Sequence, residues 1–450
     1  MRFIADLHIH SKYSRATSQN MVLEEIDRVA HNKGILVMAT GDFTHPAWFS
    51  EIKEKLEPAE PGLFKLKKQF KKPGLSGNFP ETRFILTVEI SGIYSRPSTQ
   101  LGTSRTYRIH NLIFAPDLET AAKINTRLGL IGNLSSDGRP ILGLDSRDLA
   151  KIIFDINPKA VIIPAHAWTP WFSIFGSMSG FNSIEECFGE YSKYIFAIET
   201  GLSSDPKMNW RLSQLDKIAL ISNSDSHSLA RMGREANIFD TELSYDNIIN
   251  AIKSRDPKKF IATIEFFPEE GKYHFDGHRA CGVVFDPEET KKHNNICPEC
   301  GRKLTIGVLN RVHELADRPI VKTEFSAKGG SAFGGSNYLH RWENRVPFHY
   351  TVPLDEIIAK SLGVGIASRR VQSEYENIIR IFGGEFKILM EKGLDELIHE
   401  SINPEIINGI AALREGRVRF NPPGYDGEYG NMVFVDSEKI QEFTTQKSLF

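Results

Sequence analysis

Seven short apolar runs recur along the first 230 residues, and each is followed by an acidic residue or a histidine. Runs of this length, separated by segments long enough for a helix, are typical of buried parallel strands in βα units. In barrels of such units, the chemistry collects at the C-terminal ends of the strands. The pattern therefore predicts one shared rim of imidazoles and carboxylates. The runs are 3–5, 35–38, 84–86, 107–109, 161–163, 195–197 and 218–220.

The chain has 450 residues, which is too long for one ordinary core and predicts two or three domains. Residues 1–265 hold the strand pattern, so we expect an α/β domain there. Residues 266–320 are rich in His, Cys, Gly and charge, which predicts a small metal-binding module. From about residue 350 the apolar positions recur at helical spacing, so we expect a helical domain over residues 321–435, and residues 436–450 form a polar tail.

The composition of the chain indicates a globular protein and argues against a membrane or disulfide-rich one. Hydrophobic content is 40% and charged content 25%, as in soluble globular proteins. The sequence contains neither an 18-residue apolar stretch nor a signal-peptide layout, so we expect a cytoplasmic protein without a membrane partner. The formal net charge of −2 gives no indication of a polyanionic partner. Four cysteines are too few for a disulfide framework, and their clustering points to metal.

The predicted rim has the composition of a metal site. His8 and His10 form a His-x-His pair, which alone is weak evidence because such residues are often structural. Alternation along a strand directs both side chains to one face, as ligation of one ion requires. Imidazole suits zinc, iron or manganese, carboxylates bridge neighbouring ions, and two or three such ions activate water and clamp a phosphate oxygen. The strand-end pattern repeats at Glu89, His110, His166, Asp225 and His227.

The cysteines predict a second, structural metal site. Cys297 and Cys300 form a two-residue-spaced knuckle, and His278 with Cys281 gives another pair at the same spacing. Two such pairs place four ligands on two tight turns, the geometry of a closed tetrahedral zinc site. Free thiols are the alternative. His274 and His293 compete with His278 as the fourth ligand, and Asp276 is a harder alternative.

Basic and aromatic residues point to nucleic acid. Between residues 64 and 108, nine Lys or Arg oppose two acids, with aromatic residues interleaved. Such a surface can neutralise phosphates and stack bases, although a charge run is often only a solvated face. A second basic stripe lies near residue 415. The candidate DNA-binding residues are Lys67, Lys68, Lys71, Lys72, Arg105, Arg414 and Arg417.

An aromatic loop follows the strand end at His166. Trp168, Trp171 and Phe172 could line a pocket for a flipped base or wedge a duplex open. The alternative is that some of these rings only pack the loop against the core.

The rim motifs resemble those of a known superfamily. Asp-Leu-His-Ile-His at 6–10, Thr-Gly-Asp at 40–42, Glu89, His110, His166 and Ser-Asp-Ser-His at 224–227 are similar to the successive motifs of the PHP (polymerase and histidinol phosphatase) superfamily. This resemblance implies a distorted seven-stranded β/α barrel, up to three metal ions and phosphate-ester cleavage. The ligands that it implies are His8, His10, Glu89, His110, His166, Asp225 and His227.

The chain departs from the superfamily pattern at two places. Arg15 stands where the family usually has an acidic residue or histidine, so one ligand is in doubt. Asp42 stands where the second motif usually has histidine, and His45 lies three residues further on. We interpret Asp42 as the ligand and His45 as a supporting residue or a phosphate contact.

Beyond the rim, the order of modules resembles the endonuclease Q family across essentially the whole chain. The resemblance is carried by 273–281, 297–308, 311–318 and 422–430. It implies a metal-dependent DNA repair enzyme that incises on the 5′ side of deaminated bases, such as uracil and hypoxanthine, and at abasic sites. Asp225, Glu89 and His8 are then the catalytic residues. Zinc is expected at the structural site and at the rim, where Mg²⁺ or Mn²⁺ is also possible.

Two alternatives to this enzyme remain open. One is a phosphoesterase for a small phosphomonoester, which leaves the cysteine module and the basic segment without a role. The other is a DNA-binding scaffold with a degenerate metal site, which Arg15 and the altered second motif keep open. The last residues, 446–450, resemble the start of a sliding-clamp-binding peptide but stop short of its second aromatic position, so an accidental match is the alternative there.

Overall fold

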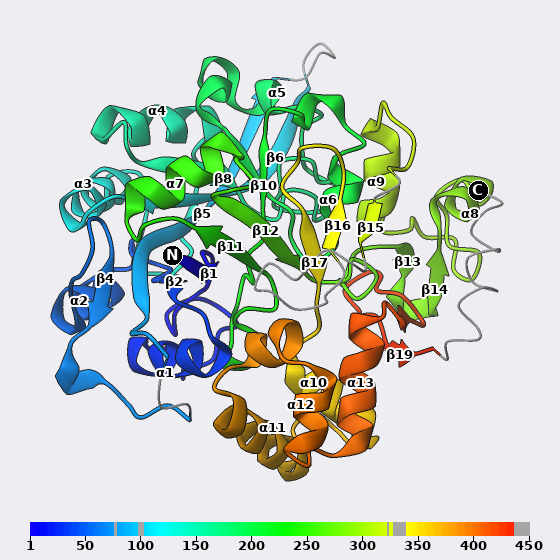
Figure 1. Cartoon of the computed structure of the whole chain (residues 1–450). Coiled ribbons are helices and arrows are strands. Elements are labelled where there is room, and N and C mark those ends of the chain that lie inside the picture. Colours follow the sequence, from blue (N-terminus) through cyan, green and yellow to red (C-terminus); the bar gives the residue numbers. More distant parts are fainter. Residues whose placement is uncertain (76–78, 98–102, 322–323, 327–338, 436–450) are drawn as a thin grey trace.

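The computed structural model describes residues 1–75, 79–97, 103–321, 324–326 and 339–435. Figure 1 shows a central β-sheet with helices packed around it, a helical layer at the bottom of the view and a small module at the right. The chain thus has the α/β class expected from the sequence, and its strands form one large sheet with smaller ones beside it. Among the described residues, no helix is both long and apolar enough to cross a bilayer.

All seven predicted runs overlap a strand. The main path of the sheet is β15-β16-β17-β12-β11-β1-β2-β5-β4-β3, with β6 joined to β5 and β8 to β6. β9 (Ala197–Glu199) and β10 (Ala219–Ile221) form a separate parallel pair. The strands of the main sheet are β1 (Arg2–Asp6), β2 (Val37–Ala39), β3 (Leu56–Pro58), β4 (Phe64–Leu66), β5 (Arg83–Pro97), β6 (Ser104–Ala115), β7 (Ile141–Leu142), β8 (Val161–Pro164), β11 (Ala236–Asp240), β12 (Phe260–Glu265), β15 (Glu324–Ser326), β16 (Leu339–Arg341) and β17 (Phe348–Tyr350).

The strand pairing is mixed, which differs from the parallel arrangement expected from the apolar runs. β2 lies parallel to β1 and to β5, but β5 and β6 form a long antiparallel ladder. The short connection between β5 and β6 explains this pairing, since a parallel crossover needs a dozen or more residues. Glu89 and His110 therefore lie within strands, on facing parts of this ladder, and not just after strand ends.

Helices cover the sheet with their apolar faces. Asp145 caps α4 by accepting from the backbone of Arg147, and Ser244 caps α7 by accepting from Asn247, so each begins at a polar residue. Four of the five residues of β1 are buried, which places the residues that follow it close to the core. The helices are α1 (Leu23–Lys33), α2 (Pro46–Lys55), α3 (Leu118–Gly129), α4 (Ser146–Ile156) and α7 (Tyr245–Ser254).

The cysteine-rich segment forms a small separate unit at the right of Figure 1. Its antiparallel strands β13 (Asp276–His278) and β14 (Val283–Phe285) precede the short helix α8 (Pro287–Lys292). Its apolar cluster has only three buried members, Val283, Cys297 and Leu304. Helix α9 (Val308–Leu315) follows, and its buried Arg311 donates to Phe181 O and Asn182 Oδ1 in the loop after β8.

The C-terminal helices form the layer at the bottom of Figure 1. They begin at Leu354, close to residue 350, where the helical spacing of the sequence begins, and residues 339–350 before them extend the central sheet through β16 and β17. Lys33 of α1 makes a buried ion pair at 3.0 Å with Glu385, which also accepts from Tyr375 at 2.7 Å and so fixes the layer to the sheet region. The helices are α10 (Leu354–Leu362), α11 (Arg369–Phe382), α12 (Leu394–His399) and α13 (Pro404–Arg414), and the hairpin β18 (Val418–Phe420) and β19 (Met432–Phe434) follows.

Candidate active site

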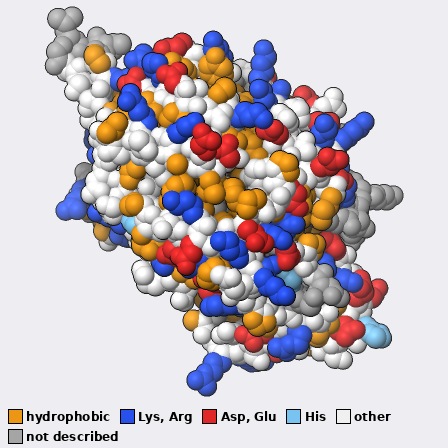
Figure 2. Space-filling model, turned by 90° about the vertical axis from the view of Figure 1, so that its left-hand side faces the viewer, with side chains coloured by type: hydrophobic (Ala, Val, Ile, Leu, Met, Phe, Trp, Pro, Cys, Tyr) orange, Lys and Arg blue, Asp and Glu red, His pale blue; other side chains and the backbone are white. Residues whose placement is uncertain are grey.

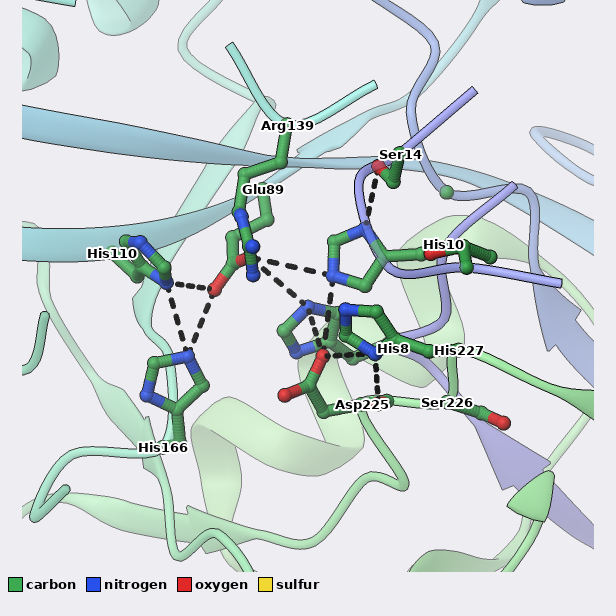
Figure 3. A network of polar contacts seen from close by, with 12 residues as sticks. His8, His10, Ser14, Glu89, His110, Arg139, His166, Asp225, Ser226 and His227 are labelled. Carbon is green, nitrogen blue, oxygen red and sulfur yellow. Dashed lines mark hydrogen bonds and ion pairs between the residues drawn. The ribbon is translucent and has the colours of Figure 1, made fainter. Parts of the chain in front are cut away.

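Two groups of potential metal ligands face each other beside the end of β1 (Figure 3). The ligand atoms within each group lie within 4.8 Å of one another. The structure thus brings together six of the eight residues predicted for the rim. The inner group is His8, His10 and Asp225, and the outer group is Glu89, His110 and His166.

The backbone is strained where it delivers these side chains. Asp225 has φ +45° and His166 has φ +31°, both in the left-handed region that few non-glycine residues adopt. Such positions cost on the order of 1–3 kcal/mol each and persist where the surroundings hold them, typically at functional sites. Gly201 shows how tightly His166 is enclosed, because a Cβ at that glycine would lie 2.7 Å from the His166 Cβ.

The inner group presents three buried atoms without a hydrogen bond. His8 Nε2 and His10 Nε2 lie 3.7 Å and 3.1 Å from Asp225 Oδ1. None of these three atoms has a hydrogen-bond partner among the described residues. Buried polar atoms are seldom left unsatisfied, because desolvation then goes uncompensated. Their convergence fits a cation at this position.

The outer group is organised by Glu89. Its Oε1 lies 2.7 Å from His110 Nδ1 and 2.9 Å from His166 Nε2. Its Oε2 lies 3.4 Å from His10 Nε2 and 3.0 Å from Arg139 Nη1. Glu89 therefore stands between the two groups, as Figure 3 shows, and can bridge two cations. Arg139 was not predicted, because it lies outside the strand-end pattern.

Carboxylates hold the two inner histidines from behind. His8 Nδ1 lies 3.1 Å from Glu199 Oε1, and His10 Nδ1 lies 3.0 Å from Asp42 Oδ1. The second oxygen of Asp42 accepts from the backbone N and the hydroxyl of Ser11 at 2.6 Å and 2.7 Å. Asp42 was expected to be a ligand, but its oxygens are engaged and it orients His10 instead. Glu199 was not named as a site residue, although it follows the sixth apolar run as the other rim residues follow theirs.

Hydroxyl groups hold the two outer histidines. His110 Nε2 lies 3.1 Å from Ser91 Oγ, and His166 Nδ1 lies 3.1 Å from Thr169 Oγ1. All four histidines thus have one ring nitrogen fixed by the protein and the other directed to the rim. This arrangement is typical of metal-ligating imidazoles, whose outer partners set tautomer and orientation.

Charge in the rim shifts several pKa values. Burial opposes ionisation of His8, but the charges of Glu199, Asp225 and Glu89 raise its pKa to about 9. Burial lowers the pKa of His110 to about 4, against the opposing effect of Glu89. Burial also opposes ionisation of Glu89 and Asp225, yet the surrounding histidines and, for Glu89, Arg139 hold the pKa of each well below the usual range. Both carboxylates are therefore anionic near neutral pH and available to a cation.

The remaining predicted rim residues lie at its edge. The ring of His227 is 4.5 Å from that of His10, and its Nδ1 lies 2.9 Å from the backbone oxygen of Asp225. His45 Nε2 lies 3.2 Å from the backbone oxygen of Ser135. Arg15 is mostly exposed and approaches Asp137, so it does not enter the rim.

A cavity of about 700 Å³ opens beside the outer group. His110, His166, Asp225 and His227 line one part of it. Four cationic side chains and several aromatic rings line the rest, which makes the cavity suited to a phosphate-bearing ligand with a planar group. The cations are Arg139, Arg231, Arg234 and Lys272, and the rings belong to Trp171, Phe172, Tyr273 and Tyr429.

The aromatic loop divides between cavity and core. Trp171 lines the cavity with its ring centre 5.9 Å from that of Tyr273, and Phe172 lines it beside His110. Trp168 is buried, and its Nε1 donates to Asn209 Oδ1 at 2.8 Å. Two of the three proposed base-contacting residues are therefore exposed to a ligand, and Trp168 packs the loop.

The cysteine module brings together the four residues predicted to bind zinc. Sγ of Cys300 lies 3.4 Å from His278 Nδ1, and the ligand atoms of the set lie within 4.8 Å of one another. Hydrogen bonds with the thiols of Cys300 and Cys297 raise the pKa of Cys281 to about 11. The competing histidines are engaged elsewhere: His274 contacts Ser203 O at 3.1 Å, and His293 stacks on Phe285.

Most of the predicted DNA-binding cations have acidic or backbone partners. On the face seen in Figure 2, Lys and Arg side chains are interspersed with Asp and Glu. Lys71 pairs with Glu81 and Lys72 with Glu25, so the basic segment is largely neutralised by neighbouring elements. Lys67 donates to the backbone oxygen of Glu54, and Arg105 to that of Gly180. Arg414 donates to the backbone oxygens of Ile388 and Leu389. Arg417 pairs with Glu415, and Lys68 is exposed. Their contact with DNA stays a prediction.

One family model and two uncharacterized proteins are similar to this chain in sequence. The family model described as the MJ0043 C-terminal domain matches residues 353–417, which cover α10 to α13. The uncharacterized protein MJ0043 of Methanocaldococcus jannaschii is 32% identical over 292 residues, 63% of this chain, and the chain spans about a third (33%) of its length. The uncharacterized protein YqxK of Bacillus subtilis is 27% identical over 96% of this chain and 99% of its own.

Two solved structures resemble this chain over nearly its whole length. The lesion-specific endonuclease PfuEndoQ from Pyrococcus furiosus is 28% identical with a TM-score of 0.77, covering 98% of this chain and 99% of its own. An endonuclease Q complex with a 27-mer duplex bearing an abasic lesion at the active site is 28% identical with a TM-score of 0.78, covering 97% and 98%. The resemblance to endonuclease Q expected from the sequence is confirmed.

Proposed function

We propose that this chain is a metal-dependent DNA repair endonuclease that hydrolyses the phosphodiester 5′ of deaminated bases, such as uracil and hypoxanthine, and of abasic sites. The coarser class, a DNA endonuclease, is shown by the likeness to endonuclease Q over nearly the whole chain. The observation that carries the finer proposal is the position of the rim, which lies against a cavity lined by cations and aromatic rings.

The rim residues fit metal ions. The three unpartnered inner atoms, of His8, His10 and Asp225, offer two imidazoles and one carboxylate to one ion. Glu89, His110 and His166 offer the same ligand types to a second. Both sets suit zinc, with Mn²⁺ or Mg²⁺ as alternatives. When bound, ions of this kind activate a water molecule and neutralise charge that develops on a phosphate oxygen.

The protein's own residues bind and orient the substrate. Arg139 is held at 3.0 Å by Glu89 and also lines the cavity, so its remaining N–H groups are placed to donate to phosphate oxygens. Arg234 and Lys272 supply further positive charge along the cavity, whereas Arg231 is paired with Glu356. Together these cations can hold the phosphates on both sides of the lesion while the rim faces the bond to be cut.

The aromatic wall accounts for lesion choice. Trp171 and Phe172 can stack against a nucleotide turned out of the duplex. Extrusion costs least where a base pairs poorly or is missing, and deaminated bases and abasic sites share this property. Opening of the duplex therefore selects the lesion before the rim acts.

We extend the proposal to the other parts of the chain. Residues 1–265 form a PHP-type barrel, 266–320 a zinc-stabilised module and 321–435 a DNA-binding region. The tail at 436–450 lies outside the described residues, and contact of 446–450 with a sliding clamp is proposed from its sequence alone.

A panel of end-labelled duplexes tests the proposed activity. Matched strands carry uracil, hypoxanthine, an abasic site or no lesion, and each is incubated with the protein and Zn²⁺, Mn²⁺ or Mg²⁺ beside a phosphomonoester. We expect incision 5′ of each lesion, leaving a 3′-hydroxyl, with the undamaged strand intact. Turnover of the phosphomonoester alone would favour a small-molecule phosphoesterase. Lesion binding without incision under every metal would favour a scaffold.

A further inference from the structure

The inner and outer groups of the rim differ in access. His8 and His10 are fully buried and do not line the cavity. His110 and His166 are 6% and 8% exposed, and both line the cavity. The outer group thus meets the cavity through its two imidazoles, whereas the inner group meets it through Asp225 alone, whose side chain is 25% exposed. An ion in the inner group is therefore reached only from the side of Asp225, and its two imidazoles are covered by protein.

The groups also differ in what lies behind their imidazoles. The inner pair is backed by the carboxylates of Glu199 and Asp42. The outer pair is backed by the neutral hydroxyls of Ser91 and Thr169. A carboxylate behind an imidazole makes the ring a stronger ligand, and changing such a partner typically costs about 10- to 100-fold in metal affinity.

The third difference is what an ion has to displace. The inner ligand atoms make no hydrogen bond of normal geometry, and the shortest contacts of His10 Nε2 are 3.1 Å to Asp225 and 3.4 Å to Glu89. In the outer group, His166 Nε2 is 2.9 Å from Glu89 Oε1 and His110 Nδ1 is 3.2 Å from His166 Nε2. Arg139 already binds the same carboxylate at 3.0 Å and adds a positive charge beside it. A cation entering the outer group must break these contacts and tolerate Arg139, which weakens its net binding.

We infer that the rim binds two metal ions with unequal affinity: His8, His10 and Asp225 retain one, and Glu89, His110 and His166 exchange the other with solvent. This inference rests on the metal dependence of the proposed function. In use, the inner ion stays with the protein, and the outer ion is the one whose supply and identity set activity.

Zinc release from the full-length holoprotein tests this inference without DNA. A chromogenic chelator in excess reports the time course, and an organomercurial, which displaces zinc from thiolates, identifies the ion of the cysteine module separately. We expect two further phases, one fast and one slow. His166→Ala should remove only the fast phase, and His10→Ala should remove the slow one.

Three conservative variants compare the partners behind the inner and the outer imidazoles, and they are less prone to misfold than the alanine variants. Glu199→Gln should speed the slow phase about 10- to 100-fold, because the inner imidazole loses its carboxylate partner. Thr169→Val should leave the slow phase unchanged. Asp42→Asn repeats the first test on His10, and circular dichroism checks each fold.

Equal release rates for both ions would overturn the inference, as would loss of the slow phase in His166→Ala. Failure of the proposed function is recognised separately: a protein that shows two release phases but cuts no lesion-containing duplex retains the inference and refutes the nuclease. A protein that cuts such duplexes but releases both ions together supports the nuclease and refutes the inference of unequal affinity.

Discussion

The histidine rim and the cysteine module are both candidate metal sites, and they are built in different ways. In the rim, strands of the large core deliver the ligands, and each of the four imidazoles is fixed from behind by a second side chain. In the module, four potential ligands lie close together, and one of them, Cys297, belongs with Val283 and Leu304 to the small apolar cluster. From this comparison we expect that the fold alone arranges the rim, whereas the module needs a bound ion to stay folded.

Removing a rim ligand should give the largest loss of activity without loss of fold. Asp225→Ala deletes a ligand of the inner group, and we expect incision to fall by about a thousandfold or more, since activated water and phosphate clamping together supply several kcal/mol. Lesion-DNA binding, measured by fluorescence anisotropy, should survive because affinity comes mainly from backbone contacts. Asp246→Ala removes an exposed carboxylate and serves as the control. Nicking by folded Asp225→Ala at a comparable rate would contradict the role of the rim.

Removing a module ligand should instead damage the fold. Cys297→Ser deletes a buried ligand, and we expect the loss of one zinc per chain together with faster proteolysis around residues 273–308. Metal content is measured by elemental analysis. Cys187→Ala, at a buried cysteine far from the other three in sequence, should leave zinc content unchanged. Full zinc retention in Cys297→Ser would refute the assignment.

The two tryptophans of the aromatic loop sharpen the contrast between function and fold. Trp171→Ala removes a ring from the cavity and should weaken lesion-DNA binding by about 1–3 kcal/mol, the usual contribution of one stacked base. Trp168→Ala creates a void in the core and should lower the free energy of unfolding by about 3–5 kcal/mol. Binding titrations and thermal melts on both variants measure the two effects. Equal binding by Trp171→Ala and the parent would exclude stacking at this position.

Deleting residues 446–450 should have the smallest effect. The deletion touches neither metal site, so incision of free oligonucleotides should stay within about twofold of the parent. Stimulation by a sliding clamp should fall if the resemblance to a clamp-binding peptide is functional. Pull-down with the purified clamp checks this, and unchanged capture would show that the match is accidental.

The sequence predicted the rim better than it predicted the way the strands build it. The strand-end histidines and acids identified six residues that the structure brings together, because short apolar runs and the polar residues after them are local signals. The antiparallel pairing of β5 with β6 was not predicted, since it depends on contacts between whole strands. The position of Asp42 in the motif does not show the contacts with His10 and Ser11 that engage its oxygens in the folded chain.

Arg139 could not be found from the sequence at all. It lies on the connection before β7, and only the folded chain places its guanidinium 3.0 Å from Glu89. Glu199 offered a local signal, because it follows an apolar run, but its role behind His8 depends on geometry. Residues whose function comes from tertiary contact alone are therefore the ones that pattern analysis misses.

Hydrogen–deuterium exchange of the full-length protein, with and without exhaustive chelation, tests the contrast between the two metal sites most directly. The account predicts that chelation removes protection from residues 273–308, because the module loses the ion that staples it. Protection of β1, β5 and β6 should persist, because the core and the outer partners hold the rim without metal. Loss of protection in these strands, or full protection of the module after its zinc has been removed, would contradict the account.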